Sequence, residues 1–317
     1  MAVSYTDWGA DPPARPVPEP PTSAAVAEPR ARPSETLKLL CLHGWRSNRR
    51  VTSLQLSNLG LHVDPDYGGD GALARLVAPT LIDGPVRSSR AYDTLLGEMF
   101  APPWCSWVDG ADGPEHDTPA GLAMLREACE HVLDVCAREG PFDGAYGFSQ
   151  GALVVTLLCS PAARAALGVR EPGGGGVGTA TAPFRFAILA CGAAPPASLA
   201  SHDLAVPSLH IIGAEDHIRA RSRTLRTLWQ SGGSSCETYE GAFGHAIPMG
   251  FRFDRKGRAV VEAFLLSRKE ASAGARAPQP AAADLERPPK SLSPWAWLSR
   301  ALFAGSAAVV VWLSLSS

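Results

Sequence analysis

Short apolar runs alternate with longer stretches of helical periodicity along residues 36–267 of the chain. The apolar runs predict strands at residues 37–42, 143–148, 184–190, 208–212 and 236–239. The helical periodicity predicts helices at residues 122–139, 152–158, 219–230 and 259–267. Alternating strands and helices are typical of a mostly parallel sheet with helices on both faces. The pattern therefore predicts the α/β class, in one domain spanning residues 36–267.

The two ends of the chain differ in composition from this central part. Residues 1–35 are rich in Pro, Ala and acidic side chains, which predicts a disordered leader. They lack the apolar core of a secretory signal. Residues 268–294 are rich in Ala, Pro and charged side chains, which predicts a linker between the domain and the end of the chain.

Residues 295–317 form a hydrophobic tail. It begins with Trp295, and no charged side chain follows Arg300. As a helix this tail would reach roughly 35 Å, enough to cross a bilayer. We therefore expect a cytoplasmic protein with a candidate tail anchor in an intracellular membrane. The alternative is an apolar tail that packs on the domain or on a partner.

The segment 147–151 places Ser149 in a G-x-S-x-G frame between a predicted strand and a predicted helix. This is the context of a nucleophile elbow, in which a sharp turn projects the serine hydroxyl above a sheet. Gly147 and Gly151 lack a Cβ, so the strand and the helix can approach closely around the turn. Ser149 is therefore the candidate nucleophile.

A serine nucleophile needs a histidine base, and the histidine needs a carboxylate to orient it. Asp216 lies on a predicted loop just after the strand at 208–212, and His245 lies on a glycine-flanked loop after the strand at 236–239. The order Ser, acid, His is the one found in α/β-hydrolases. Glu215 is the alternative acid.

The developing oxyanion needs two backbone N–H donors. One is expected from Gln150, the residue after the candidate nucleophile. The other is expected from Trp45, because the strand at 37–42 runs directly into a His43-Gly44 turn that exposes backbone. His43 is expected to brace this loop.

These motifs together resemble the FSH family of serine hydrolases, a branch of the α/β-hydrolases that includes the ovarian-tumour-associated esterases. The resemblance covers residues 37–266, and three segments carry most of it: 40–45 (LCLHGW), 140–152 (GPFDGAYGFSQGA) and 244–248 (GHAIP). It implies the α/β-hydrolase fold, with Ser149 as nucleophile, Asp216 as acid and His245 as base. It also implies carboxylesterase or thioesterase activity without a cofactor or metal.

Composition narrows the function further. The formal net charge is −2, and no basic stripe is present, which argues against nucleic-acid binding. Seven cysteines without a C-x-x-C pair favour a reducing compartment over a disulfide framework or a zinc site.

We therefore expect a serine hydrolase that cleaves small-molecule or lipid-like acyl esters or thioesters through an acyl-enzyme. Two alternatives stay open. One is an acyl-protein thioesterase or lysophospholipase, which also uses the G-F-S-Q-G segment. The other is a non-catalytic, membrane-tethered interaction protein that has kept the fold.

Overall fold

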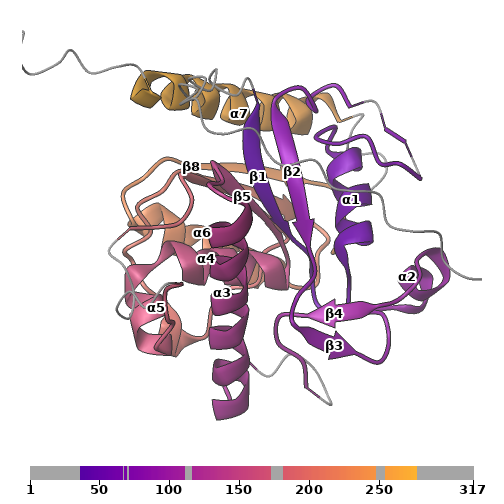
Figure 1. Ribbon diagram of the computed structural model, residues 1–317. Coiled ribbons are helices and arrows are strands. Elements are labelled where there is room, and N and C mark those ends of the chain that lie inside the picture. Colours follow the sequence, from indigo (N-terminus) through magenta and orange to yellow (C-terminus); the bar gives the residue numbers. More distant parts are fainter. Residues whose placement is uncertain are drawn as a thin grey trace, which may run out of the picture. The chain divides into compact units, whose positions relative to one another are not determined.

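Six parallel strands form one sheet in the order β2-β1-β5-β6-β7-β8 (Figure 1). The computed structural model describes residues 36–66, 68–69, 71–110, 116–172, 181–247 and 254–276. The strands of the sheet are β1 (Leu37–Leu42), β2 (Val77–Ile82), β5 (Gly144–Phe148), β6 (Phe186–Ala190), β7 (Ser208–Gly213) and β8 (Cys236–Gly241). Two further strands, β3 (Val86–Ser88) and β4 (Trp104–Ser106), pair antiparallel beside it. The predicted α/β class is confirmed.

All five predicted strands are present, but β2 was missed. It pairs in parallel with β1 and forms one edge of the sheet. Five of its six residues are exposed or only half-buried, and Pro79 lies in its middle. Proline is tolerated on an edge strand because one side of the strand faces solvent, and no neighbouring strand there needs the N–H that proline lacks. In the sequence VAPTLI the proline argues against a strand, although the flanking residues are apolar.

The helices of the described ranges extend the predicted set. They are α1 (Arg49–Asn58), α2 (Thr94–Met99), α3 (Pro119–Glu139), α4 (Gln150–Cys159), α5 (Pro161–Leu167), α6 (Arg219–Ser231) and α7 (Arg255–Arg276), with one 3₁₀ turn at Ala197–Leu199. Helices α3, α4, α6 and α7 confirm predicted ones. Helix α7 continues past residue 267 into the predicted linker at 268–294.

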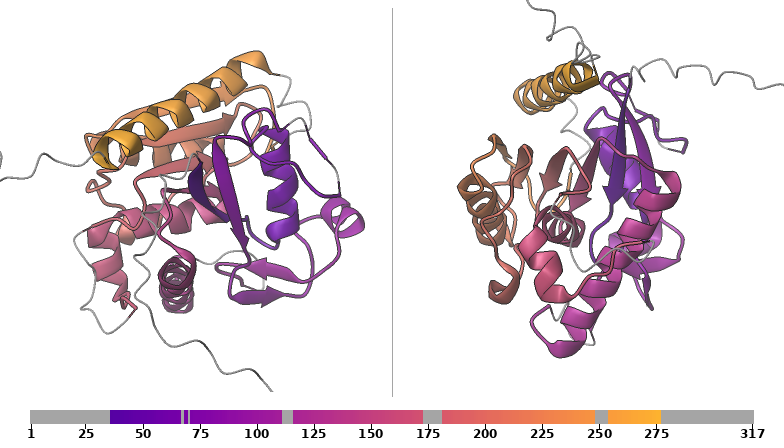
Figure 2. Two further views of the ribbon diagram at one scale, coloured as in Figure 1. Left: turned by 45° about the horizontal axis from the view of Figure 1, so that its top comes forward. Right: turned by 60° about the vertical axis from the view of Figure 1, so that its left-hand side comes forward.

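Helices cover both faces of the sheet (Figures 1 and 2). Alternate residues of β1 show the division: Leu40 and Leu42 belong to the apolar cluster with α3, α4, α5 and α6. Leu39 and Cys41 belong to the cluster with α1 and α7. Burial on both faces explains why the central strands are almost uniformly apolar.

The predictions for the two ends of the chain concern residues outside the described ranges. These are the leader at 1–35, the linker beyond residue 276 and the hydrophobic tail at 295–317. Within the described ranges, no single helix combines the length and apolarity needed to cross a membrane. The pair α4 and α5 passes the same test together, although the two helices are bent by 101° at their junction.

Candidate active site

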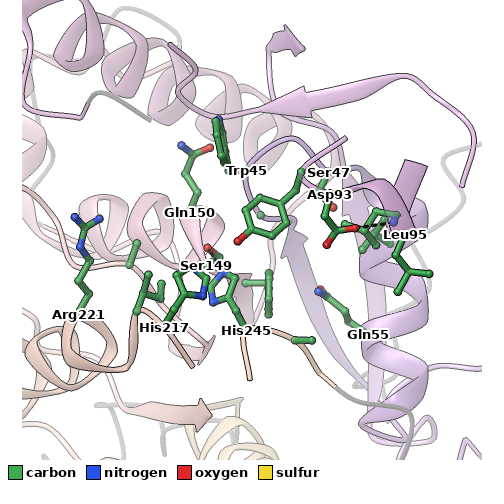
Figure 3. A pocket seen from close by; sticks show the side chains of 18 of the residues that line it. Trp45, Ser47, Gln55, Asp93, Leu95, Ser149, Gln150, His217, Arg221 and His245 are labelled. Atoms are coloured by element: carbon green, nitrogen blue, oxygen red, sulfur yellow. Dashed lines mark hydrogen bonds between the residues drawn. The ribbon is translucent and has the colours of Figure 1, made fainter. Parts of the chain in front are cut away.

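Four loops at the carboxyl ends of the parallel strands carry the predicted site residues. Ser149 directly follows β5, and Trp45 lies in the loop after β1. Asp216 follows β7, and His245 follows β8. Because parallel strands end at one edge of the sheet, these loops meet there, as Figure 3 shows for Ser149 and His245.

The turn at Ser149 has the strained backbone of a nucleophile elbow. Its φ is 52° and its ψ is −111°, a conformation that side-chain-bearing residues seldom adopt. A Cβ on Gly147 would lie 2.6 Å from the backbone of Ala152. A Cβ on Gly151 would lie 2.5 Å from the carbonyl oxygen of Leu42. Both glycines are therefore required by the close approach of the elbow to its neighbours.

A continuous hydrogen-bonded path joins the three predicted triad residues. The Oγ of Ser149 lies 2.9 Å from Nε2 of His245. Nδ1 of His245 lies 2.9 Å from Oδ2 and 3.0 Å from Oδ1 of Asp216. An ionised carboxylate only accepts, so Nδ1 carries the proton and Nε2 is free to accept from Ser149. The ring is thus held in the tautomer that a general base needs.

Asp216 is stabilised in its charged form. Burial raises the pKa of this carboxyl, but the hydrogen bonds from His245 and from the Ile218 amide, at 2.8 Å, outweigh burial and hold the pKa below its ordinary value. Glu215, the alternative acid, has an exposed side chain. The structure brings Asp216 and not Glu215 into contact with His245.

Aromatic rings surround the base. Phe148 lies 5.2 Å and Tyr92 lies 6.2 Å from the His245 ring, measured between centroids. His217 packs edge-on against the same ring at 4.9 Å. The side chain of His245 is consequently only 12% exposed. This enclosure fixes the ring and limits the access of water to it.

The two residues predicted to supply the oxyanion donors line the same cavity as Ser149. Trp45 and Gln150 both line this cavity, which has a volume of about 420 Å³. Among the described residues, no acceptor is bonded to the backbone N–H of either one. The N–H of Gln150 is also in the first turn of α4, where backbone donors have no partner within the helix. Both N–H groups are therefore available to a ligand.

The side chain of Gln150 holds its own backbone in place. Its Oε1 accepts from the N–H of Trp107 at 2.8 Å and of Val108 at 3.2 Å. Its Nε2 donates to the carbonyl of Val108 at 2.8 Å. These hydrogen bonds join the first turn of α4 to the segment after β4. The sequence pattern did not indicate this contact.

Asp109 is the residue that fixes the Trp45 loop, and sequence reasoning missed it. Its carboxylate accepts from Nε1 of Trp45 at 2.9 Å and forms an ion pair with Arg46 at 3.0 Å. It also accepts from the hydroxyl of Ser88 at 2.6 Å. The Arg46 guanidinium lies 4.3 Å from the centre of the Trp45 ring. Only the fold brings these side chains together, because more than 60 residues separate Asp109 from Trp45.

His43 braces the same loop in its neutral form. Its Nε2 accepts from the N–H of Gly84 at 2.8 Å, so Nδ1 carries the proton and donates to the carbonyl of Gly44 at 2.6 Å. Burial lowers its pKa to about 4. The ring packs against Trp107, whose Nε1 donates to the His43 carbonyl at 2.7 Å. These contacts agree with the expected structural role.

We expect stability to fall as the pH is lowered from about 6.5 towards 4. Burial lowers the pKa of His43 to about 4 and of His210 to about 3, below the usual value of 6.5. In this window the unfolded chain binds a proton at each histidine that the folded protein does not, so acid favours unfolding. The expected loss is roughly 1–2 kcal/mol per histidine at pH 5. Urea unfolding at pH 7.5 and pH 5 measures it.

Two variants check the origin of this pH dependence. His210→Gln removes one buried titrating group and should make stability less sensitive to acid. His202→Gln replaces an exposed histidine in the same way and is the matched control. Equal sensitivity in all three proteins would contradict the assignment.

Three potential metal ligands also meet at this site. Ligand atoms of Cys191, Asp216 and His245 lie within 4.8 Å of one another. The Asp216 and His245 atoms are already engaged with each other, and His245 is also bonded to Ser149. Burial, followed by the nearby charge of Asp216, raises the pKa of the Cys191 thiol, which disfavours the thiolate that binds metals. The set is better suited to proton transfer than to holding an ion.

Residues 33–256 match the family model described as "Serine hydrolase (FSH1)". The match includes every strand of the sheet and all of the residues that meet at the site. The chain belongs to the FSH1 serine hydrolase family. This establishes it as an enzyme of the serine hydrolase class with the α/β-hydrolase fold, as the sequence motifs predicted.

Individual relatives of this FSH1 hydrolase are consistent with the family assignment. The chain is 30% identical to Esterase OVCA2 of Xenopus tropicalis over 209 residues, which cover 62% of the chain and 80% of the relative. It is 27% identical to Hydrolase phiM of a fungal species over 238 residues, covering 71% of the chain and 94% of the relative. Among solved structures, it is similar to acyl-protein thioesterase 2 of Zea mays, with 19% identity, a TM-score of 0.46, and coverage of 76% of the chain and 97% of that protein.

Proposed function

We propose that this FSH1 hydrolase cleaves carboxylic esters or thioesters through an acyl-enzyme on Ser149. The observation that carries this proposal is the unbroken hydrogen-bonded path from Ser149 through His245 to Asp216. The path opens into a cavity lined by Trp45 and Gln150, whose backbone N–H groups have no acceptor within the described residues. Relatives named as esterases support the same reaction class.

Acylation is the first half of the proposed reaction. His245 accepts the proton of Ser149 as the serine oxygen attacks the substrate carbonyl. The negative charge that develops on the carbonyl oxygen is stabilised by the N–H groups of Trp45 and Gln150. The protonated His245 is stabilised by Asp216 and returns the proton to the leaving oxygen or sulfur. The alcohol or thiol departs and leaves an ester on Ser149.

Deacylation repeats these steps with water. His245 accepts a proton from the water as its oxygen attacks the acyl-enzyme carbonyl, and the same two N–H groups stabilise the second oxyanion. The proton then passes from His245 to the oxygen of Ser149, the acyl bond breaks, and a carboxylic acid is released. The enzyme returns to its starting state without any cofactor entering the scheme.

Labelling with a fluorophosphonate tests whether Ser149 is activated. We expect the full chain to be labelled and Ser149→Ala to remain unlabelled, because the probe reacts with a serine whose proton a neighbouring base can accept. Ser231→Ala, which changes an exposed hydroxyl on α6, is the matched control and should be labelled normally. Circular dichroism confirms that each protein is folded.

A folded parent that resists labelling would contradict the hydrolase mechanism. That result would mean that Ser149 is not activated by His245. Labelling that persists in Ser149→Ala would place the reactive serine elsewhere.

A further inference from the structure

The cavity at Ser149 extends to both sides of the nucleophile, and the two sides differ in chemistry. Figure 3 shows Leu95 on one side of Ser149, and Arg221 and His217 on the other. All four residues line the same cavity. If a substrate binds with its carbonyl at Ser149, the parts on either side of the carbonyl therefore contact different side chains.

The first side carries apolar side chains beside polar ones. Val51 of α1, Leu95 and Leu96 of α2 and Tyr92 supply the apolar part, and Ser47, Gln55 and Asp93 lie on the same side (Figure 3). Leu95 is 63% exposed and Tyr92 is 40% exposed, so both offer apolar surface to a ligand. Covering such surface with a hydrocarbon chain is favourable by about 25 cal/mol per Å². This side fits the alkyl part of an ester.

The second side carries hydrogen-bond donors and a positive charge. Arg221 of α6 lines the cavity beside His116 and His217. Arg221 and His116 also line an adjoining hollow of about 290 Å³, whose wall includes Pro195 and Pro196. Arg221 thus lies where the two spaces meet, within the same cavity as the nucleophile.

The arginines of α6 differ in their partners. Arg223 forms an ion pair with Glu240 on β8, at 3.0 Å, and Arg219 is paired with the same carboxylate. Within the described residues, Arg221 has no ion pair or hydrogen bond of its own side chain. Asp117 lines the adjoining hollow, but no ion pair joins it to Arg221. The guanidinium of Arg221 is therefore available to an incoming anion.

His116 adds a neutral donor. Nε2 of His116 lies 3.1 Å from Nε2 of Gln150, which can only donate, so the His116 nitrogen accepts and its proton resides on Nδ1. Burial, and after it the charge of Arg221, lowers the pKa of His116 to about 4, so the ring is neutral at physiological pH. An imidazole N–H and a guanidinium are both suitable donors for carboxylate or phosphate oxygens.

We propose that the preferred substrates of this site carry an anionic group, a carboxylate or a phosphate, which Arg221 binds on the side of the scissile carbonyl opposite an apolar chain. This inference rests on the proposed function of Ser149 and adds a specificity-determining residue to it. The anion can belong to the acyl part or to the leaving group, because both are attached to the same carbonyl.

Two matched pairs of esters test the proposal and distinguish these sources. In the first, the anion is in the acyl part: 4-nitrophenyl hydrogen suberate is compared with 4-nitrophenyl methyl suberate. In the second, it is in the leaving group: 4-octanoyloxybenzoate is compared with its methyl ester. We expect kcat/KM to favour the anionic member of at least one pair by about tenfold at low salt.

Two variants of α6 test whether Arg221 causes the preference for anionic esters. Arg221→Gln should abolish the preference by lowering kcat/KM for the anionic esters, because the anion loses its partner. Arg223→Gln removes an equal charge from the same helix outside the cavity, and should keep the preference. Both side chains are exposed, so neither change disturbs the core.

The possible outcomes separate this proposal from the proposed function. Hydrolysis of the neutral esters that depends on Ser149, without any preference for an anion, would overturn the role of Arg221 alone. A preference that survives in Arg221→Gln, or is lost equally in Arg223→Gln, would also overturn it. Failure to hydrolyse any of the four esters, together with absent fluorophosphonate labelling, would instead count against the hydrolase mechanism.

Discussion

If the proposed mechanism holds, replacing Asp216 by asparagine is expected to lower kcat by about 10³- to 10⁴-fold at pH 7, the scale seen when the triad aspartate of Ser-His-Asp enzymes is neutralised. In the native protein the carboxylate accepts from Nδ1 of His245, which leaves Nε2 to accept from Ser149. An asparagine amide can donate to Nδ1 and so stabilise the opposite tautomer. Nε2 would then carry a proton, and it could not accept another from the serine. Steady-state hydrolysis of a 4-nitrophenyl ester measures the effect.

Glu215→Gln is the matched control for Asp216→Asn. It neutralises the adjacent carboxylate, whose side chain is exposed and does not contact His245. We expect its kcat to stay within about twofold of the parent value. Similar losses in both variants would mean that general negative charge near the site matters, and that the specific contact with His245 does not.

Replacing Gly151 by alanine is expected to destabilise the fold by about 3 kcal/mol, which corresponds to a fall of roughly 10 °C in Tm for a domain of this size. The added Cβ would lie 2.5 Å from the carbonyl oxygen of Leu42 and 2.6 Å from that of His43. Both obstacles are backbone atoms at the end of β1, so no side-chain rotation relieves the overlap. Calorimetry measures the shift in Tm.

Gly97→Ala is a suitable comparison because it also adds one methyl group. Gly97 lies in helix α2, where the nearest atom to an added Cβ is the Cβ of Ala91 at an ordinary 3.7 Å. Alanine favours helix over glycine by about 1 kcal/mol, so Tm should stay the same or rise slightly. Loss of stability in Gly97→Ala as large as in Gly151→Ala would contradict the steric explanation.

The central strands of the sheet could be predicted from the sequence because both of their faces are buried in apolar surroundings. Strands such as β1 and β5 are buried on both faces, so they appear as short apolar runs bounded by glycine or polar residues. The candidate catalytic residues follow such runs directly. Their approximate position could therefore be inferred without knowledge of the tertiary structure.

Elements with mixed surroundings were harder to predict. Helix α1 buries polar side chains, among them Thr52, Gln55 and Asn58, so its buried face does not appear as an apolar stripe. Its start depends on Asn48, whose side chain accepts from the amides of Arg50 and Val51. Helix α2 contains no buried residue at all, and so it leaves no pattern in the sequence.

Contacts between distant segments could not be predicted from local patterns. The links from Asp109 to Trp45 and Arg46 join two loops, and their partners are set by how the β3–β4 pair packs beside the sheet. The same is true of Arg221. Its helix was predicted, but whether this arginine or Arg223 reaches the cavity depends on the rotation of α6 about its axis.

Pro79 in the edge strand β2 also affects how copies of the protein meet one another. The N–H of Leu37 donates to the carbonyl of Leu76, so Leu76 and every second residue after it turn their backbone groups toward β1. Pro79 belongs to the other set, so the N–H that proline lacks is missing from the outer side of the strand. A strand from another molecule would find a gap in the row of donors that it needs for pairing. The edge of the sheet is thereby protected against the strand-to-strand association from which aggregates grow.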